Sequence, residues 1–416
     1  MAEDGQKSNV SLIPDGSAKG LKVMPTIDNF VRLMTNHYGD DLRLNEMTGK
    51  PEFKRHGEWR EWNDTEESRM RSYFESTYSM YSQNKMTDAL LIYFNQHKVN
   101  PLLQILEGLV WDGKPRVEQF LHDVMKCEDS EYTRECSRLI FAGGIHRAYN
   151  PGCKFDDMIV LIGDQGTGKS TVTRWLNIDE QFYQEIKTIN GKEGIEAIRG
   201  VWIGEVSELM AMTRVKEAEA VKAYITSQKD SYRPPYQKNV QTIPRRCVFI
   251  GTTNNPQFLT DKTGNRRFYP VKVNSDGYKL LDNEKPVREY IRQAWAEAVQ
   301  LYKEGKLQPF ARKEVLEQIR AAQEAAMEDD WRIGAIEQYL EDAKKRPNDT
   351  VTVIELWHNA LNEPSESKPG RADSIAITQI VTAIPGWTRC SMKINTAWGR
   401  QKCFKKVNPF FPSWRS

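Results

Sequence analysis

An α/β nucleotide-binding core, between an α-rich N-terminal domain and a small winged-helix-like C-terminal domain, is the architecture that the 416-residue sequence predicts. An apolar run at 158–162 leads directly into a glycine-rich loop. Apolar strands and helical patterns then alternate over residues 150–275, as a parallel sheet requires. The C-terminal region has the pattern of three helices followed by a basic β-hairpin. Together these features predict a P-loop NTPase with two accessory domains.

The predicted divisions are a disordered lead-in (1–20), an α-rich domain with a small hairpin (21–149), the ATPase core (150–328) and a basic C-terminal domain (329–416). The polar N-terminus lacks an apolar signal segment, and no run of 18 apolar residues occurs, so we expect no membrane partner. The six cysteines are scattered and form neither a zinc pattern nor a disulfide framework.

In the N-terminal domain we expect two strands around a Thr-Gly-Lys turn within residues 42–62. Helical patterns follow at 65–83, 86–97, 101–109, 115–125 and 130–149. The domain has no paired acids on a strand and no zinc cluster, so a polymerase-type primase domain is not expected.

The glycine-rich loop carries the most specific motif of the chain. Gly163 and Gly168 bracket four residues, and Lys169 and Ser170 complete the pattern G-x-x-x-x-G-K-[ST]. Such glycines let backbone N–H groups converge on a phosphate at a helix N-terminus, while the lysine reaches the outer phosphates and the serine ligates Mg²⁺. We therefore predict ATP and Mg²⁺ as cofactors. The expected nucleotide-binding residues are Gly163, Asp164, Gln165, Gly166, Thr167, Gly168, Lys169, Ser170 and Thr171.

Two acidic residues follow the second apolar strand, predicted at 201–205. Glu205 ends that strand, and Glu208 comes three residues later. P-loop enzymes place there the acid that holds Mg²⁺ or polarises water. We predict Glu205 as a metal-site and catalytic residue and Glu208 as a second catalytic acid. The sequence leaves open which of the two is the general base.

Polar and basic residues after the third strand, predicted at 246–252, complete the catalytic set. An amide such as that of Asn254 can hold the attacking water near the γ-phosphate, although a turn-forming Asn pair is the alternative. Arg266 and Arg267 follow on a turn, where an arginine can reach a neighbouring subunit's γ-phosphate. We predict that one of them, with Arg266 preferred, acts in trans within a ring.

The segment 228–246, between the second and third strands, is basic and contains two tyrosines. Cations bind backbone phosphates, and aromatic faces stack on unpaired bases. We therefore predict that this segment is a protein hairpin that binds single-stranded DNA rather than a solvated loop. Its expected DNA-binding residues are Lys229, Tyr232, Arg233, Tyr236, Lys238, Arg245 and Arg246.

The C-terminal domain has predicted helices at 332–344, 351–361 and 374–384, followed by a hairpin at 387–407. Residues 374–416 contain seven Lys and Arg and no acid, which favours binding to double-stranded DNA. Docking of a host primase or polymerase is the competing interpretation.

The order of these motifs resembles that of superfamily 3 helicases of the AAA+ type, and most closely the virulence-associated E family of phage and mobile-island proteins. The matching phrases are Trp111–Arg116, Pro151–Asp156, the P-loop, Gly200–Leu209, Asp230–Tyr236, Gly251–Asn254 and Thr263–Phe268. The resemblance implies a hexameric ATPase that works in replication of a mobile element, in the cytoplasm of a bacterial host, beside a separate primase. Gly204 departs from the family's adjacent acidic pair.

Two other functions remain open at this stage. A P-loop kinase acting on a small molecule shares the loop, but it has no use for the basic, tyrosine-bearing insertion. A nucleotide-switched DNA-binding adaptor that recruits host replication proteins is the alternative to a motor.

Overall fold

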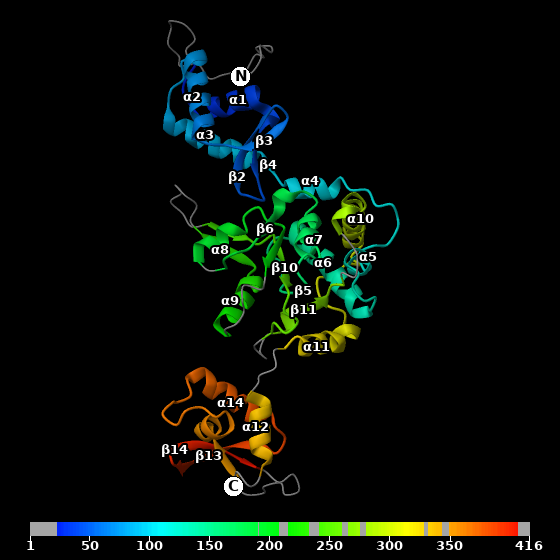
Figure 1. The fold of residues 1–416 in the computed structure, drawn as a ribbon. Coiled ribbons are helices and arrows are strands. Elements are labelled where there is room, and N and C mark those ends of the chain that lie inside the picture. Colours follow the sequence, from blue (N-terminus) through cyan, green and yellow to red (C-terminus); the bar gives the residue numbers. More distant parts are fainter. Residues whose placement is uncertain are drawn as a thin grey trace. The chain divides into compact units, whose positions relative to one another are not determined.

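The computed structural model describes residues 23–189, 191–207, 215–232, 241–259, 265–274, 280–327, 332–342 and 349–406. The chain divides into two compact units, Met1–Met327 and Glu328–Ser416 (Figure 1). The lead-in predicted at 1–20 lies outside the described residues. Among the helices in the described ranges, none is long and apolar enough to cross a membrane.

The N-terminal part of the first unit has its own hydrophobic core, which includes Phe30, Phe74 and Tyr93. Its elements are α1 (Ile27–Tyr38), β1 (Leu42–Asn45), β2 (Lys50–Arg55), β3 (Glu58–Glu61), α2 (Asp64–Tyr78), α3 (Gln83–Gln96) and β4 (Lys98–Val99). The region predicted as two strands thus contains three. The turn that the sequence did not reveal lies at His56 and Gly57, which both have positive φ, 52° and 83°. A two-residue hairpin turn needs that conformation, but histidine is not among its usual residues.

A five-stranded parallel sheet forms the centre of the first unit, with the order β11-β5-β10-β7-β6. The strands are β5 (Met158–Ile162), β6 (Tyr183–Glu185), β7 (Ile203–Ser207), β10 (Val248–Thr253) and β11 (Phe268–Lys272). All residues of β5 and β10 are buried. Strands covered on both faces read as near-continuous apolar runs, which explains why β5 and the apolar first half of β10 were visible in the sequence.

Helices cover both faces of this sheet (Figure 1). Ile159 and Leu161 of β5 face a core shared with helices α6, α7 and α10, whereas Met158 and Val160 face a second core that includes residues of α9. Side chains alternate between the faces of a strand, so adjacent residues of β5 enter different cores. The covering helices are α6 (Glu131–Tyr149), α7 (Lys169–Leu176) and α10 (Glu284–Lys303) on one face, and α8 (Gly191–Ala197) and α9 (Val215–Thr226) on the other.

Helices α4 (Pro101–Glu107), α5 (Phe120–Met125) and α6 pack into the same core as the sheet. The boundary predicted at 149/150 therefore does not separate two hydrophobic cores. Helix α6 is buried around most of its circumference from Thr133 to Ala148, as expected for a helix inside a domain rather than on a cap. Further along, α11 (Leu316–Ala325) contacts β11.

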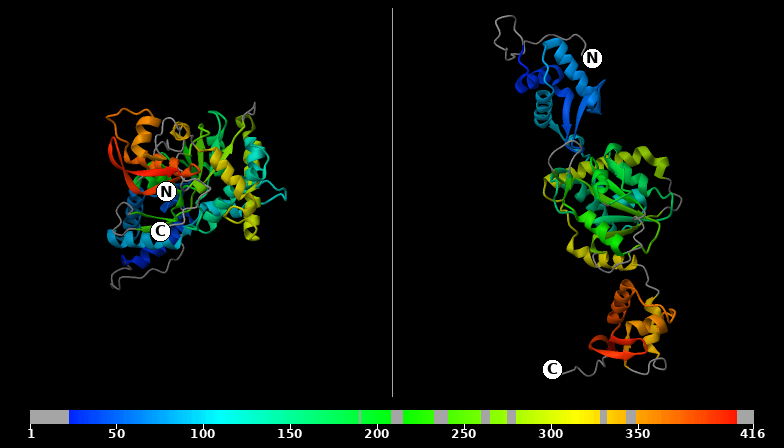
Figure 2. Two further views of the ribbon diagram at one scale, coloured as in Figure 1. Left: turned by 90° about the horizontal axis from the view of Figure 1, so that it is seen from below. Right: turned by 90° about the vertical axis from the view of Figure 1, so that its left-hand side faces the viewer.

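The second unit is built around Ile336, Leu356, Ile377 and Phe404. Its elements are α12 (Arg332–Glu341), β12 (Thr350–Thr352), α13 (Val353–Glu355), a π-helical turn (Leu356–Ala360), α14 (Arg371–Ala383), β13 (Trp387–Thr396) and β14 (Gly399–Lys406). The strand order is β12-β14-β13. The segment predicted as a helix from 351 thus begins in a strand, whose β-branched residues pair with β14. Figure 2 shows the hairpin of β13 and β14 in red.

Candidate functional site

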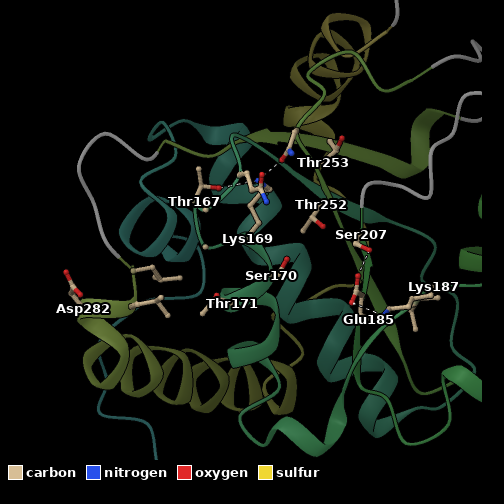
Figure 3. Close-up of a pocket in the computed structure, with 17 residues that line it drawn as sticks. Thr167, Lys169, Ser170, Thr171, Glu185, Lys187, Ser207, Thr252, Thr253 and Asp282 are labelled. Carbon is tan, nitrogen blue, oxygen red and sulfur yellow. Dashed lines mark hydrogen bonds and ion pairs between the residues drawn. The ribbon is translucent and has the colours of Figure 1, made fainter.

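The candidate site is a pocket at the carboxyl ends of the parallel strands, the usual ligand position in such sheets. It has a volume of about 1060 Å³ and is lined by the glycine-rich loop, by Ser207 and by residues 252–254. Figure 3 shows Lys169 between two groups of lining residues, Glu185 and Lys187 on one side and Asp282 on the other.

Lys169 is the central cation of the pocket and is only 8% exposed. Its Nζ donates to the backbone oxygens of Gly163 and Asp164, at 2.6 and 2.8 Å. Burial lowers the pKa of Lys169, and the nearby carboxylates of Asp164 and Glu205 oppose that shift. Gly168, with φ of 86°, makes the turn into α7, and a Cβ there would lie 2.7 Å from the Leu280 side chain. The loop conformation therefore requires glycine at this position.

Glu205 is buried, with 1% exposure, and its carboxylate accepts three hydroxyl hydrogen bonds. The donors are Ser170 Oγ at 2.6 Å, Thr252 Oγ1 at 2.7 Å and the Tyr183 hydroxyl at 2.6 Å. Burial and the bond to Glu205 raise the pKa of Tyr183, which keeps this hydroxyl a donor. Glu205 lies in the middle of β7 rather than at its end as predicted, because the strand runs two residues further, to Ser207.

Gly204, where the sequence resemblance implies a second acid, faces the other side of the sheet from Glu205. A Cβ on Gly204 would lie 3.2 Å from Phe249 and 3.3 Å from Ile186, which are both buried apolar residues. An acid here would enter an apolar core, so Glu205 is the carboxylate of β7 directed at Ser170. Glu208 lies outside the described residues.

The carboxylate of Glu185 lines the pocket and was missed from the sequence. It pairs with Glu205 across β6 and β7, accepts a hydrogen bond from Ser207 Oγ at 2.7 Å and lies 3.9 Å from Lys187 Nζ. Tyr183 precedes it by two residues and belongs to the same face of the strand. Strand β6 has only three residues, too few for a periodic pattern, so only the pairing with β7 reveals these positions.

Asn254 follows β10 and reaches the glycine-rich loop. Its side-chain oxygen accepts a hydrogen bond from Lys169 Nζ at 3.2 Å. The neighbouring Asn255 makes the turn instead, since its N–H donates to Thr253 Oγ1 and its amide donates to the Gln257 carbonyl. The two asparagines therefore have different partners, and Asn254 alone of the pair contacts Lys169.

Arg266 and Arg267 do not join this pocket. They lie in a 3₁₀ turn (Asn265–Arg267) immediately before β11, which runs parallel to β5. They are thus at the amino edge of the sheet, roughly 16 Å from its carboxyl edge at the usual rise per residue. Arg266 is exposed, whereas Arg267 is half-buried with its Nε 3.8 Å from the Asp156 carboxylate.

The basic insertion forms strands β8 (Lys229–Tyr232) and β9 (Gln241–Pro244), which pair antiparallel and lead into the amino end of β10. Lys229 is exposed, and Arg246 is half-buried with a guanidinium nitrogen 3.7 Å from Glu46. Arg233, Tyr236, Lys238 and the side chain of Tyr232 lie outside the described residues.

Arg245 was predicted to bind DNA, and this prediction is wrong for the described structure. The residue is 3% exposed, its Nε donates to Asp230 at 2.9 Å, and its guanidinium also donates to the Tyr224 carbonyl. The buried Arg147 of α6 donates to the backbone oxygen of Arg245 at 3.1 Å. Arg245 is thus enclosed at the base of the hairpin, where it cannot present its charge to a nucleic acid.

Replacing Arg245 with alanine should destabilise the first unit by about 3 kcal/mol, because it leaves the largely buried carboxylate of Asp230 without its cation. The shift in the midpoint of urea unfolding measures this loss. Arg246→Ala is the matched control, since its more exposed and longer ion pair is worth no more than about 1 kcal/mol. Equal losses in the two variants would contradict a structural role specific to Arg245.

Comparisons with known proteins bear on the family and the fold of the chain. Residues 106–328 match the family model described as the virulence-associated protein E-like domain. Among solved structures, the chain is similar to the apo structure of the NrS-1 C-terminal region, at 14% identity and a TM-score of 0.50, over 88% of this chain and 96% of that chain. Two A-form apo structures of the same region cover the same shares, at 12% and 13% identity and TM-scores of 0.49 and 0.47. A comparison with curated proteins gives no match.

Proposed function

We propose that this chain, which belongs to the virulence-associated protein E-like family, is an ATP-driven DNA translocase or helicase. Its setting would be the replication of a phage or other mobile element, in the cytoplasm of a bacterial host and beside a separate primase. The observation that carries the proposal is the convergence of Lys169, Ser170, Glu205 and Asn254 on one pocket, with Arg266 at the opposite edge of the sheet.

The residues of the pocket fit ATP with Mg²⁺. The glycine-rich loop opens into α7, so its N–H groups and the helix N-terminus favour phosphate, and Lys169 adds a positive charge at the same place. Mg²⁺ would be held by the Ser170 hydroxyl and, through water, by Glu205; when bound it neutralises charge on the phosphates. Leu280 and the exposed Leu281 supply apolar surface at the pocket, where a nucleobase can pack.

Hydrolysis needs a group that orients the attacking water. Asn254 suits this role because its amide contacts Lys169 without adding negative charge beside the phosphates. Glu185 and Glu208 are the candidates for the general base, since Glu205 is engaged by three hydroxyls and is the better metal-site residue.

Arg266 supports the proposal of a ring, for which the family resemblance implies a hexamer. An exposed arginine at the edge remote from its own pocket can meet only another subunit's nucleotide. ATP would then be hydrolysed at subunit boundaries, with Lys169 from one subunit and Arg266 from the next.

Single-stranded DNA would be gripped by the β8–β9 hairpin, which leads into the amino end of β10 and so lies away from the nucleotide pocket. Among the described residues of the hairpin, Lys229 is an exposed cation. Arg233, Tyr236 and Lys238, which lie between the two strands in the sequence, carry the rest of this proposal.

The direct test is ATP hydrolysis by the full chain with and without single-stranded DNA. A translocase should hydrolyse ATP several-fold faster on DNA, because strand binding selects the hydrolysing arrangement of subunits. Duplex unwinding with a tailed substrate then separates a helicase from a translocase. Hydrolysis indifferent to DNA, together with phosphorylation of a small acceptor, would favour a kinase. ATP binding and DNA binding without turnover would favour the nucleotide-switched adaptor.

A further inference from the structure

The second unit carries a cationic hairpin that the proposed motor does not use. Residues 374–416 contain no Asp or Glu. Six exposed cations lie on the two strands: Arg389, Lys393, Arg400, Lys402, Lys405 and Lys406. Within the described ranges, none of these six side chains has an ion-pair partner. The hairpin therefore presents positive charge that its own unit does not neutralise.

The strand register gathers most of this charge on one face. Lys402 pairs directly with Lys393, Arg400 with Asn395, and Arg389 with Phe404. Directly opposed residues share a face, and alternate residues of β14 return to it, so these cations and Lys406 share the face of Phe404. Phe404 itself packs in the core of the unit, whereas the cations on this face keep their side chains exposed around it. Like charges that lie directly opposite each other destabilise an antiparallel pair of strands. Lys393 and Lys402 are such a pair, and neither has an acidic partner among the described residues that would offset the repulsion. A polyanion bound along the exposed cationic side chains would remove that repulsion.

The elements next to the hairpin suit a double helix. Helix α14 precedes β13 and packs against it, and it leaves Ile375 and Gln379 exposed, one helical turn apart. An α-helix fits the major groove, where glutamine can bind an adenine edge and an apolar side chain can contact a thymine methyl. Together, the order of helices and the strand order β12-β14-β13 give a helix and an adjacent hairpin, the two parts of a winged helix-turn-helix module.

Binding of single strands is less well supported by this unit. It depends on aromatic faces that are open to unpaired bases. The ring at the hairpin turn, Trp398, is stacked on His358, with ring centroids 4.9 Å apart and an interplanar angle of 26°. That ring face is already covered.

We propose that the second unit binds duplex DNA, with α14 in the major groove and the β13–β14 hairpin along the neighbouring phosphates. This function is separate from ATP hydrolysis and would hold the protein on double-stranded DNA beside the strand on which the motor acts.

The test uses the full chain without nucleotide and a labelled blunt duplex, titrated at two salt concentrations. Lys393→Ala with Lys402→Ala should weaken binding on the order of 50-fold near 0.1 M salt and reduce the slope of log K against log salt by about 2, because two counterion-releasing contacts are lost. Lys393→Arg with Lys402→Arg should retain the affinity. The matched control is Lys98→Ala with Lys313→Ala, two exposed lysines of the first unit, which should bind the duplex like the parent chain.

Circular dichroism melting shows whether each variant is folded. Unchanged duplex affinity in the folded Lys393→Ala, Lys402→Ala variant would overturn the proposal. The same holds for a loss of affinity that leaves the salt slope unchanged, and for no duplex binding by the parent chain at low salt, which would favour a protein-docking unit. Since ATP is absent throughout, these outcomes leave the proposed motor untouched.

Discussion

Replacing Lys169 with alanine should lower ATP turnover by at least 10²–10³-fold, the effect of removing one preorganised charge-stabilising donor. The reason is the position of Nζ, which contacts the loop carbonyls and the Asn254 amide, while Lys169 itself is only 8% exposed. Release of phosphate at saturating ATP measures the effect.

The matched control for this variant is Lys154→Ala, an exposed lysine near the amino end of β5. It removes the same charge from the chain and should hydrolyse ATP at the parent rate. If both variants lose activity equally, the effect belongs to net charge or folding rather than to phosphate contact. If Lys169→Ala keeps most of its turnover, the pocket described here is not the hydrolytic site.

Replacing Arg266 with alanine should lower turnover by roughly 10³-fold or more, the usual contribution of an arginine supplied in trans. Its place at the amino edge of β11 excludes its own pocket, so the loss must arise at a neighbour's site. Mixing Arg266→Ala protein with Lys169→Ala protein tests this directly. In a randomly mixed ring, roughly a quarter of the boundaries combine an intact lysine with an intact arginine, so part of the activity should return.

Arg267→Ala is the comparison within the same turn. Its guanidinium faces Asp156, so this variant should act through stability more than through turnover. No rescue at any mixing ratio, with a monomer in light scattering under ATP and DNA, would contradict a shared site. If Lys169→Ala protein regains activity when mixed with Arg267→Ala protein but not with Arg266→Ala protein, Arg267 rather than Arg266 is the arginine that acts in trans.

The parts of the site that could be predicted are those with a contiguous pattern. The glycine-rich loop and β5 stand together in the sequence, and the apolar first half of β10, Val248–Ile250, comes four residues before Asn254. The start of β7 was misplaced because Trp202 extends the apolar run on the N-terminal side, although its indole N–H donates to the Gly144 carbonyl and it precedes the strand. Local hydrophobicity cannot distinguish a buried turn from a strand.

What the sequence could not reveal depends on pairing between distant segments. Glu185 becomes part of the pocket only through the register of β6 on β7. Arg245 belongs to a cluster of basic residues in the sequence, yet the one acid of that insertion, Asp230, lies beside it across the hairpin and binds it. A count of charges predicts a basic surface, but the fold determines which of the cations are buried in ion pairs and which are exposed.

Strand β10 has a consequence for how ATP and DNA affect one another. Its carboxyl end carries Thr252, which binds Glu205, and leads to Asn254, while its amino end follows Arg245 and the base of the β8–β9 hairpin. All of its residues are buried, and it lies between β5 and β7 in the sheet. Because its surroundings are closely packed, a displacement at one end of the strand is transmitted to the other end. If binding of DNA at one end is coupled to binding of nucleotide at the other, the coupling is reciprocal. DNA must then change the affinity for nucleotide by the same factor by which nucleotide changes the affinity for DNA.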